Sequence, residues 1–234
     1  MVKATVLDTE DLNGSTVTWE PDALDGKDAE YAGKAPDYDA TGRAMPYYSR
    51  EAAGGLHVEP IVFSDKPHAN DWYDIPKSTG RTYMTEPHTY PIDGKDVAMT
   101  SFNVPIMVKG AFRGVASVDF GLARLSEILG SLKVIDGGHL ALVSNGGLYA
   151  SNPDAARTGK KADDIPAAGL EAIRQGQTYE YADTRGGVHL LQPVRLQADI
   201  APWSIKRSFP PRVVTADARD LRTYALLVSV LCAE

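Results

Sequence analysis

The sequence predicts an α+β protein built from two consecutive units, each an antiparallel sheet with few, short helices. Short β-branched or aromatic runs follow one another along the chain and are separated by tight turns. The regular alternation of strands and helices that marks a doubly wound parallel sheet is missing. After a division near residues 130–136, a similar series of strands, turns and a helix begins again on a smaller scale.

Composition sets broad limits on size, partners and compartment. The chain has 234 residues, 43% hydrophobic and 24% charged, which suits one large domain or two small ones. Its formal net charge is -7 and it has no basic run, so we expect no nucleic-acid partner. The single cysteine, Cys232, excludes a disulfide framework and a cysteine-based zinc site, but it leaves export from the cytoplasm open.

The first unit opens with clear strand patterns. Residues 14–19, GSTVTW, are β-branched and alternate, which predicts a strand. The acidic stretch after it predicts a loop with a short helical turn, and AMPYYSR at 44–50 predicts a second strand. Residues 51–80 are dense in Gly, Pro, His and Asp, and we expect a long irregular and functional segment there. Within it, Pro76 disfavours helical backbone at Ile75.

Three further strands in hairpin order complete the first sheet. YMTEPHTYPI and VAMTSFNVPIMV are joined by the turn DGKD at 93–96, and a Lys-Gly turn leads into GAFRGVASVDF. A helix follows, because apolar residues then recur at helical spacing. These residues are Leu122, Leu125, Ile128, Leu129 and Leu132.

The second unit shows the same kinds of pattern. The predicted strands, in chain order, are GHLALVSN, LYASN, TYEYAD, VHLLQPVRL and WSIKRSF, with a loop and a helix within residues 153–176. A last helix begins at Pro210 and Pro211, residues suited to a first turn. The apolar run from Tyr224 is too short to cross a bilayer, which takes about 20 residues. It is either the end of a core helix or the first turns of a membrane helix.

Residue patterns of common catalytic sites are missing from the sequence. There is no G-x-S-x-G nucleophile turn and no G-x-x-x-x-G-K phosphate loop. The five histidines are scattered, and the acidic loop at 22–28 fails the spacing of a calcium-binding EF-hand. No carboxylate pair stands out as that of a glycosidase. We therefore expect no cofactor, no metal and no enzymatic activity, and a binding function instead.

Several segments together resemble the double Cache (dCache) sensor domain, the extracytoplasmic part of many bacterial methyl-accepting chemotaxis proteins and of some sensor kinases and cyclases. The segments resembling its ligand-binding half are TVTWEPDALDGKDAEYAG, PYYSR, DWYDIPKSTGRTYMTEPHTY, VAMTSFNVPI and FRGVASVDFGLARL. GGHLALVSNGGLYASNPDAARTGK and PWSIKRSFPPRVV resemble its second module. The similarity runs from about residue 14 to the end of the chain. It depends on the order and spacing of the segments rather than on any single motif.

The resemblance implies two PAS-like modules and a periplasmic location in an inner-membrane protein. Residues 1–132 would be the membrane-distal, ligand-binding module and residues 133–210 the membrane-proximal module. Residues 211–234 would form a helix leading into a truncated transmembrane segment. Only residues 2–13 would remain of a long N-terminal helix. The family also implies a homodimer in the full receptor.

Asp119 is the leading candidate for a ligand contact. It interrupts the apolar run GVASVDF, with Val118 and Phe120 on the opposite face of the strand. A carboxylate turned toward an apolar interior must be paired or hydrogen-bonded. Its partner is either structural, Arg50 or Arg113, or an ammonium group of a ligand. The resemblance, in which SVDF matches a strand with an acidic ligand contact, favours the ligand.

Aromatic residues of NDWYDI are the second candidates. Trp72 and Tyr73 either pack in the core or flank a bound cation with their ring faces. The resemblance places DWYDIP over the pocket. Asp71 is either a loop acid or a source of negative potential at the pocket mouth. In amino-acid-sensing members of the family, an arginine two places before the tryptophan holds the ligand carboxylate, but this chain has Asn70 there.

Further pocket walls are expected from neighbouring strands, with simple packing as the alternative for each: Tyr48, Tyr90, His88 and Ser101. His88 and Tyr90 stand where amino-acid-sensing relatives carry tyrosine and aspartate. Arg50 either binds an anionic ligand or forms a salt bridge with Asp119, Asp93 or Glu86.

These observations predict a sensor domain that binds a small amine-bearing or cationic metabolite through Asp119 and the Trp72 and Tyr73 aromatics. The alternative within the same class is a small carboxylate or other metabolite held by Arg50 and His88. A secreted hydrolase and a purely structural extracellular module are the competing classes.

Overall fold

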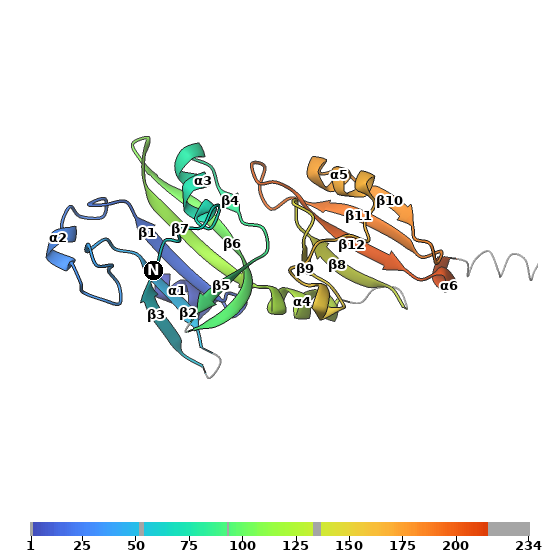
Figure 1. Cartoon of the computed structure of the whole chain (residues 1–234), viewed down its shortest axis with the longest axis horizontal. Helices are drawn as coiled ribbons and strands as arrows, with labels where there is room; N and C mark the ends of the chain where they lie inside the picture. The colour runs from blue at the N-terminus through green and yellow to red at the C-terminus, as the bar shows by residue number, and fades with distance from the viewer. Residues whose placement is uncertain (1, 52–53, 93, 133–136, 215–234) are drawn as a thin grey trace, which may run out of the picture. The chain divides into compact units, whose positions relative to one another are not determined.

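The computed structural model describes residues 2–51, 54–92, 94–132 and 137–214 and divides the chain into two compact units (Figure 1). Within the described residues, the chain up to 125 with 195–201 forms the first unit, and residues 126–194 with 202–214 form the second. Each contains one antiparallel sheet and few helices, which confirms the predicted α+β class.

The first sheet has seven strands in the order β3-β2-β1-β7-β6-β4, and β5 also pairs with β6. The strands are β1 (Gly14–Trp19), β2 (Pro46–Arg50), β3 (Leu56–Pro60), β4 (Tyr83–Met84), β5 (His88–Ile92), β6 (Lys95–Val108) and β7 (Ala111–Gly121). The helices of this segment are α1 (Val2–Asp8), α2 (Asp28–Tyr31), α3 (Asp71–Thr79) and α4 (Leu122–Ser131). The predicted hairpins around β5, β6 and β7 are confirmed by their pairing, although residue 93 of the first turn lies outside the described residues.

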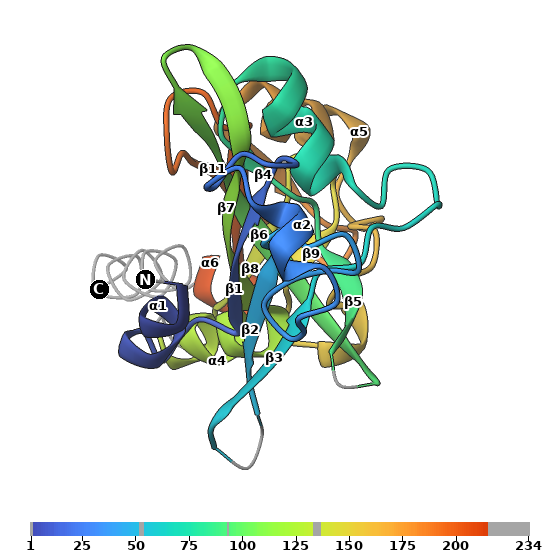
Figure 2. The same ribbon diagram turned by 90° about the vertical axis from the view of Figure 1, so that its left-hand side faces the viewer.

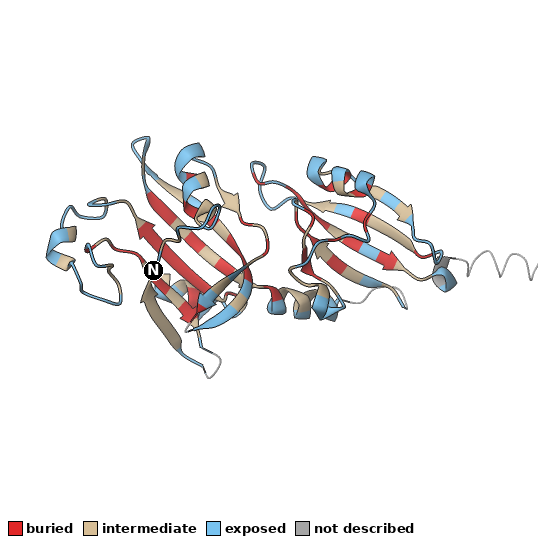
Figure 3. Ribbon diagram, in the orientation of Figure 1, coloured by how far each residue is buried: buried red, intermediate tan, exposed pale blue. Residues whose placement is uncertain are grey.

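One face of this sheet is buried and carries the candidate site. Along β7, Val115, Ser117 and Asp119 are buried and alternate with more exposed neighbours. Figure 3 shows buried positions recurring along the strands of this sheet. Helix α3 packs on β6 and β7, as the rotated view also shows (Figure 2). Because successive strand residues point to opposite faces, the register decides which side chains share this buried face.

Helix α3 corrects the expectation that residues 51–80 are irregular. The stretch also contains β3, and the helix runs through Pro76 to the left-handed cap Gly80, whose N–H bonds to the carbonyl of Pro76 at 2.9 Å. An interior proline costs a helix about 3 kcal/mol, because it removes an N–H donor and crowds the preceding turn. Burial of Tyr73 and of Pro76 itself offsets this cost.

YMTEPHTYPI was expected to form one strand, but it is divided into β4 and β5 around Glu86 and Pro87. Pro87 has no N–H to donate to a strand ladder, so the pairing is interrupted there. Both halves still pair with β6.

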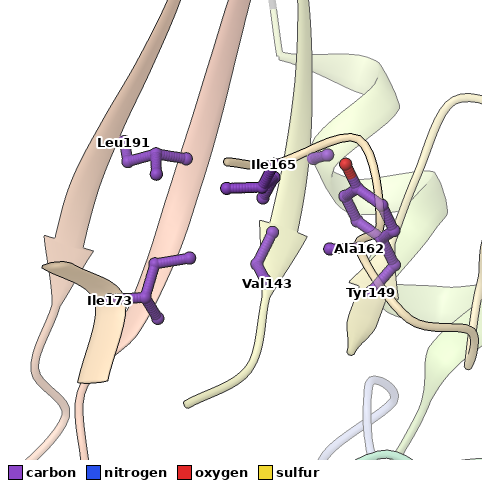
Figure 4. Packing of buried hydrophobic residues seen from close by; sticks show 7 residues of the cluster. Val143, Tyr149, Ala162, Ile165, Ile173 and Leu191 are labelled. Carbon is purple, nitrogen blue, oxygen red and sulfur yellow. The ribbon is translucent and has the colours of Figure 1, made fainter. Parts of the chain in front are cut away.

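The second sheet has five strands in the order β10-β11-β12-β8-β9. They are β8 (His139–Val143), β9 (Tyr149–Ser151), β10 (Tyr179–Ala182), β11 (Val188–Val194) and β12 (Trp203–Phe209), as predicted. Helix α5 (Ala167–Gln175) and the short 3₁₀ turn η1 (Ala155–Arg157) complete the unit. Its core packs the side chains shown in Figure 4, among them Tyr149, Ile173 and Leu191.

Helix α6 (Pro211–Val214) begins at the predicted position. The rest of the predicted C-terminal helix and its apolar run lie outside the described residues. In the part of the chain that is described, no helix is both long and apolar enough to cross a membrane.

Candidate ligand-binding site in the first unit

Asp119 is a carboxylate in the interior of the first unit. Its backbone lies in β7, between Gly14 of β1 and Ser101 of β6, and only 6% of its surface is exposed. Burial raises the pKa of this carboxyl above the usual value for aspartate. The nearby hydroxyl groups of Ser101 and Tyr47 and the charge of His88 oppose the increase without cancelling it.

Neither arginine expected as a structural partner pairs with this carboxylate. Arg50 donates hydrogen bonds to the backbone carbonyls of Val6, Thr9 and Leu12, with distances of 3.0 Å to Thr9 and 3.3 Å to Leu12. Its guanidinium therefore caps the C-terminal end of α1 and the loop after it. Arg113 is exposed. Among the residues that the structure describes, no lysine or arginine forms an ion pair with Asp119.

Three buried polar atoms near this carboxylate have no hydrogen-bond partner: Asn13 Nδ2, Tyr47 Oη and Ser49 Oγ. The backbone N–H of Asn13 donates to the Asp119 carbonyl at 2.7 Å, and Ser49 lies opposite Gly14 in the same row of the sheet. Tyr47 Oη lies close enough to Asp119 to lower its pKa, but no hydrogen bond of normal geometry joins the two side chains. Buried polar groups without partners are rare in folded proteins and need an explanation.

Aromatic and aliphatic side chains pack on the same side of the sheet. Tyr47 meets Tyr90 edge-on with ring centroids 5.7 Å apart, and Phe63 stacks on Trp72 at 5.7 Å. All four belong to one cluster that also contains Met45, Ile61, Ile92, Val97 and Met99. The cluster gives the site an apolar wall beside its polar end.

Tyr73 takes part in a network of hydrogen bonds and charges with Arg43, Glu20 and Lys77. Its hydroxyl accepts a hydrogen bond from Arg43 at 2.6 Å and donates one to Glu20. Lys77 also binds Glu20, at 2.8 Å and 3.0 Å. The Arg43 guanidinium lies 5.2 Å from the Tyr73 ring centroid. This network fastens α3 to the residues that flank β1 and β2.

Asp71 and Asn70 stabilise the local chain before and at the start of α3. The Asp71 carboxylate lies 3.2 Å from the ring of His68, whose side chain is 86% exposed, so this pair lies at the surface. Asn70 accepts a hydrogen bond from the Ser64 N–H at 3.0 Å and donates to the Ser64 carbonyl at 2.7 Å. The Asn70 side chain therefore joins the two ends of the loop between Ser64 and Asn70.

The pairing register of the strands places some of the expected site residues on the buried face of the sheet and one on the opposite face. His88, Tyr90 and Ser101 share the buried face with Asp119, because their cross-strand partners place them there. His88 Nδ1 lies 3.0 Å from the Glu86 carbonyl and 3.2 Å from Thr85 Oγ1. Tyr48 points to the opposite face, and its hydroxyl donates to Asp37 at 2.8 Å.

Sequence reasoning missed several residues around the site: Asn13, Tyr47, Ser49 and Phe63. PYYSR contains two adjacent tyrosines, and only one of them can face Asp119. Nothing in the sequence determines which, because the choice depends on the register between β1 and β2. Within the described residues, no group of three or more metal-ligating side chains lies together.

These features define a class: a protein of two tandem antiparallel α+β units, the first with a buried polar site on one face of its sheet. The chain belongs to the family of methyl-accepting chemotaxis protein-like sensor domains, because the model described as "Methyl-accepting chemotaxis protein-like, first PDC sensor domain" matches residues 1–127. Membership identifies an extracytoplasmic sensor domain of the chemoreceptor type, not an enzyme.

Individual relatives agree with the family. The chain is 27% identical to methyl-accepting chemotaxis protein TlpQ of Pseudomonas aeruginosa, over 89% of this chain and 32% of that protein. It is 26% identical to methyl-accepting chemotaxis protein PscA of Pseudomonas syringae pv. tomato, over 70% of this chain and 26% of that protein. The chain thus spans about a third or less of the length of these relatives.

Solved structures show the same fold. The extracellular domain of the putative histidine kinase mmHK1S-Z3 is 32% identical, with a TM-score of 0.78 over 94% of this chain and 80% of that one. A structure named Methyl-accepting Chemotaxis protein X is 25% identical, with a TM-score of 0.72 over 89% of this chain and 78% of that one.

Proposed function

We propose that the first unit binds a small amine-bearing or cationic metabolite and is the sensing part of a bacterial transmembrane chemoreceptor. The observation that carries this proposal is Asp119, a buried carboxylate without a lysine or arginine partner among the described residues. The charged form of such a group is costly in a protein interior unless a counter-charge is present. An ammonium group from outside would provide this counter-charge.

The polar atoms around Asp119 support the same ligand chemistry. An ammonium has three N–H donors. One could bind Asp119 and the others the oxygen atoms of Tyr47 and Ser49, which lack partners in the structure. The rings of Tyr47, Tyr90 and Trp72 would then lie against the carbon skeleton, and attraction between a cation and a ring face contributes about 0.5–2 kcal/mol.

A ligand carboxylate has less support. Asn70, at the position of the carboxylate-binding arginine of amino-acid-sensing relatives, is hydrogen-bonded to Ser64. Arg50, expected to hold an anion in the alternative proposal, is engaged by carbonyls at the end of α1. Arg43 is engaged by Tyr73. An amine that lacks a carboxylate therefore fits the site better than an α-amino acid does.

The proposal is tested by thermal-shift measurements with matched ligands. Primary amines, diamines, amino acids and carboxylates are each added to the wild-type chain and to Asp119→Asn. A bound ligand stabilises the folded state by RT ln(1 + [L]/Kd). We expect amines to raise Tm in the wild type alone. A rise with carboxylates and none with amines would support the alternative, and no rise with any metabolite would support a structural module.

The receptor-level expectations belong to the same proposal. They are the flanking membrane segments, the homodimer, and the transmission of ligand binding through the second unit toward the helix that begins at Pro211. A ligand changes the output only through its different affinity for two conformations. A chemotaxis assay of the full-length receptor tests this: Asp119→Asn should abolish the response to an amine that shifts the wild-type Tm.

A further inference from the structure

We propose that the second unit contains an alkylammonium-binding site of its own, and that the chain's own Lys206 occupies it as a tethered ligand. This inference concerns a different unit from the proposed function and does not depend on it. It rests on the position of the Lys206 ammonium, the groups that surround it and the way in which the carboxylate beside it is shared.

Lys206 is a lysine in the interior of the second unit. It lies in the middle of β12, and its side chain is only 5% exposed. Its Nζ is 2.5 Å from Asp164 Oδ2 and 3.1 Å from the hydroxyl oxygen of Tyr149. The same nitrogen lies 5.7 Å from the Tyr149 ring centroid and 6.0 Å from that of Tyr181. A carboxylate, a phenol oxygen and two aromatic rings are the groups that bind a primary ammonium.

Asp164 divides its two oxygen atoms between two cations. Arg157 binds Oδ1 at 2.9 Å, whereas Lys206 binds Oδ2. The Tyr149 hydroxyl lies 2.8 Å from Oδ1 and 3.1 Å from Oδ2. Loss of the Lys206 ammonium would therefore leave Oδ2 without its cation while Arg157 remains in place. The Asp164 side chain is 38% exposed, so this carboxylate is accessible to solvent.

The first unit offers a comparison. There, Asp119 lies beside the Tyr47 hydroxyl on the buried face of the sheet and has no lysine or arginine counter-ion among the described residues. In the second unit, Asp164 lies beside the Tyr149 hydroxyl and has Lys206. A carboxylate and a tyrosine thus occur in both units, but one of the two sites already holds an ammonium. We infer that external amines do not enter the second site while Lys206 is present.

The test replaces the Lys206 side chain and supplies the missing alkylammonium from solution. Lys206→Ala keeps Cβ and deletes three carbon atoms and the ammonium, which together correspond to propylammonium. The substitution is made in the full chain with Asp119→Asn, so that any amine bound by the first unit is not measured. We expect a lower Tm than that of the Asp119→Asn parent, and a saturable recovery when propylammonium chloride is added.

Matched controls separate site binding from general effects. Lys206→Met in the same background fills the space with an uncharged chain and should show no recovery. Propanol and potassium chloride should not replace propylammonium in Lys206→Ala. An equal response of the Ala and Met variants, or equal recovery with propanol, would overturn the proposal.

If Lys206→Ala does not fold unaided, the readout is its refolding yield with and without propylammonium. A yield several-fold higher with propylammonium than with potassium chloride supports the site, and equal yields contradict it. Because both variants carry Asp119→Asn, failure here leaves the proposed amine site of the first unit standing.

Discussion

At the scale of single residues, the candidate site depends on a carboxylate in an environment that opposes its charge. The sequence singled out Asp119 because a charged residue interrupts an apolar strand, and the structure places it in the interior. It also singled out His88, Tyr90, Ser101 and Trp72, which the structure places on the same side of the sheet. Their role in binding remains a proposal.

The first prediction concerns stability without ligand. The pKa of Asp119 is raised in the folded chain, so between pH 3.8 and that raised pKa the folded chain binds more protons than the unfolded chain. Stability from this group therefore falls as pH rises through that window. We expect Asp119→Asn to be more stable than the wild type above the window, since an amide removes the buried charge.

Chemical denaturation at several pH values measures this difference, which should shrink as pH falls toward 3.8, the usual pKa of the group. Asp74→Asn is the matched control, because Asp74 is an exposed carboxylate in α3. A wild type more stable than Asp119→Asn at neutral pH would show that the carboxylate has a counter-ion within the protein.

The second prediction concerns the pH dependence of binding. A bound ammonium lowers the pKa of Asp119 below its raised value in the free protein, so binding releases a proton between the two values. Affinity for an amine should increase with pH by up to about tenfold per unit in this window and level off above it. Calorimetry in buffers of different ionisation enthalpy measures the proton release, and an affinity that does not change across the window would contradict the mechanism.

At the scale of elements, α3 and the strand register decide what the site contains. Local rules disfavour a helix through Pro76, yet the contacts of Tyr73 with Arg43 and Glu20 hold one there. These partners are 30 and 53 positions away in the chain. A sequence pattern of a few residues cannot report such contacts, so the irregular segment was predicted where a helix exists.

The third prediction concerns β1 and Tyr47. A Cβ added to Gly14 would lie 2.4 Å from Tyr47 Oη, closer than atoms can approach. We expect Gly14→Ala to displace this ring and to lower stability by about 1–3 kcal/mol, the usual cost of overpacking. It should also abolish the amine-dependent thermal shift.

Gly121→Ala is the control, because its added Cβ would meet its nearest neighbour at an ordinary 3.8 Å. Both substitutions replace a strand glycine by alanine in the same sheet, so the change in β-sheet propensity is similar for the two variants. Similar Tm values for the two variants would show that Tyr47 has room to move and does not define the site.

At the scale of the whole molecule, each unit contains a carboxylate with a shifted pKa, and the two shifts have opposite signs: Asp119 is buried, whereas Asp164 is partly exposed. Burial raises the pKa of Asp119, whereas hydrogen bonds and charges from Lys206, Tyr149 and Arg157 outweigh the effect of burial at Asp164 and lower its pKa to about 2. These two carboxylates should therefore contribute to stability in acid with opposite signs.

The fourth prediction states that difference. Because the pKa of Asp164 is lowered on folding, its contribution is complete above pH 3.8 and is lost as pH falls from about 3.8 to about 2. The second unit should therefore lose hydrogen-exchange protection in that range, whereas protonation of Asp119 costs the first unit nothing. Mass-spectrometric exchange resolves the units, and Asp164→Asn should reduce the acid-dependent loss in the second unit. A loss of the same size in Asp164→Asn and in the wild type would contradict the assignment.

The sequence by itself determined the α+β class, the two units, most strands, the family and the leading acidic residue. These follow from alternation of side chains along strands, from turn chemistry and from the order of motifs, all of which are local properties. Only the tertiary structure decided that Tyr47 and not Tyr48 faces Asp119, that Arg50 caps α1, and that Lys206 lies beside Asp164. Those outcomes depend on register and on contacts between residues far apart in the chain, where a shift of one position reverses the face of every side chain.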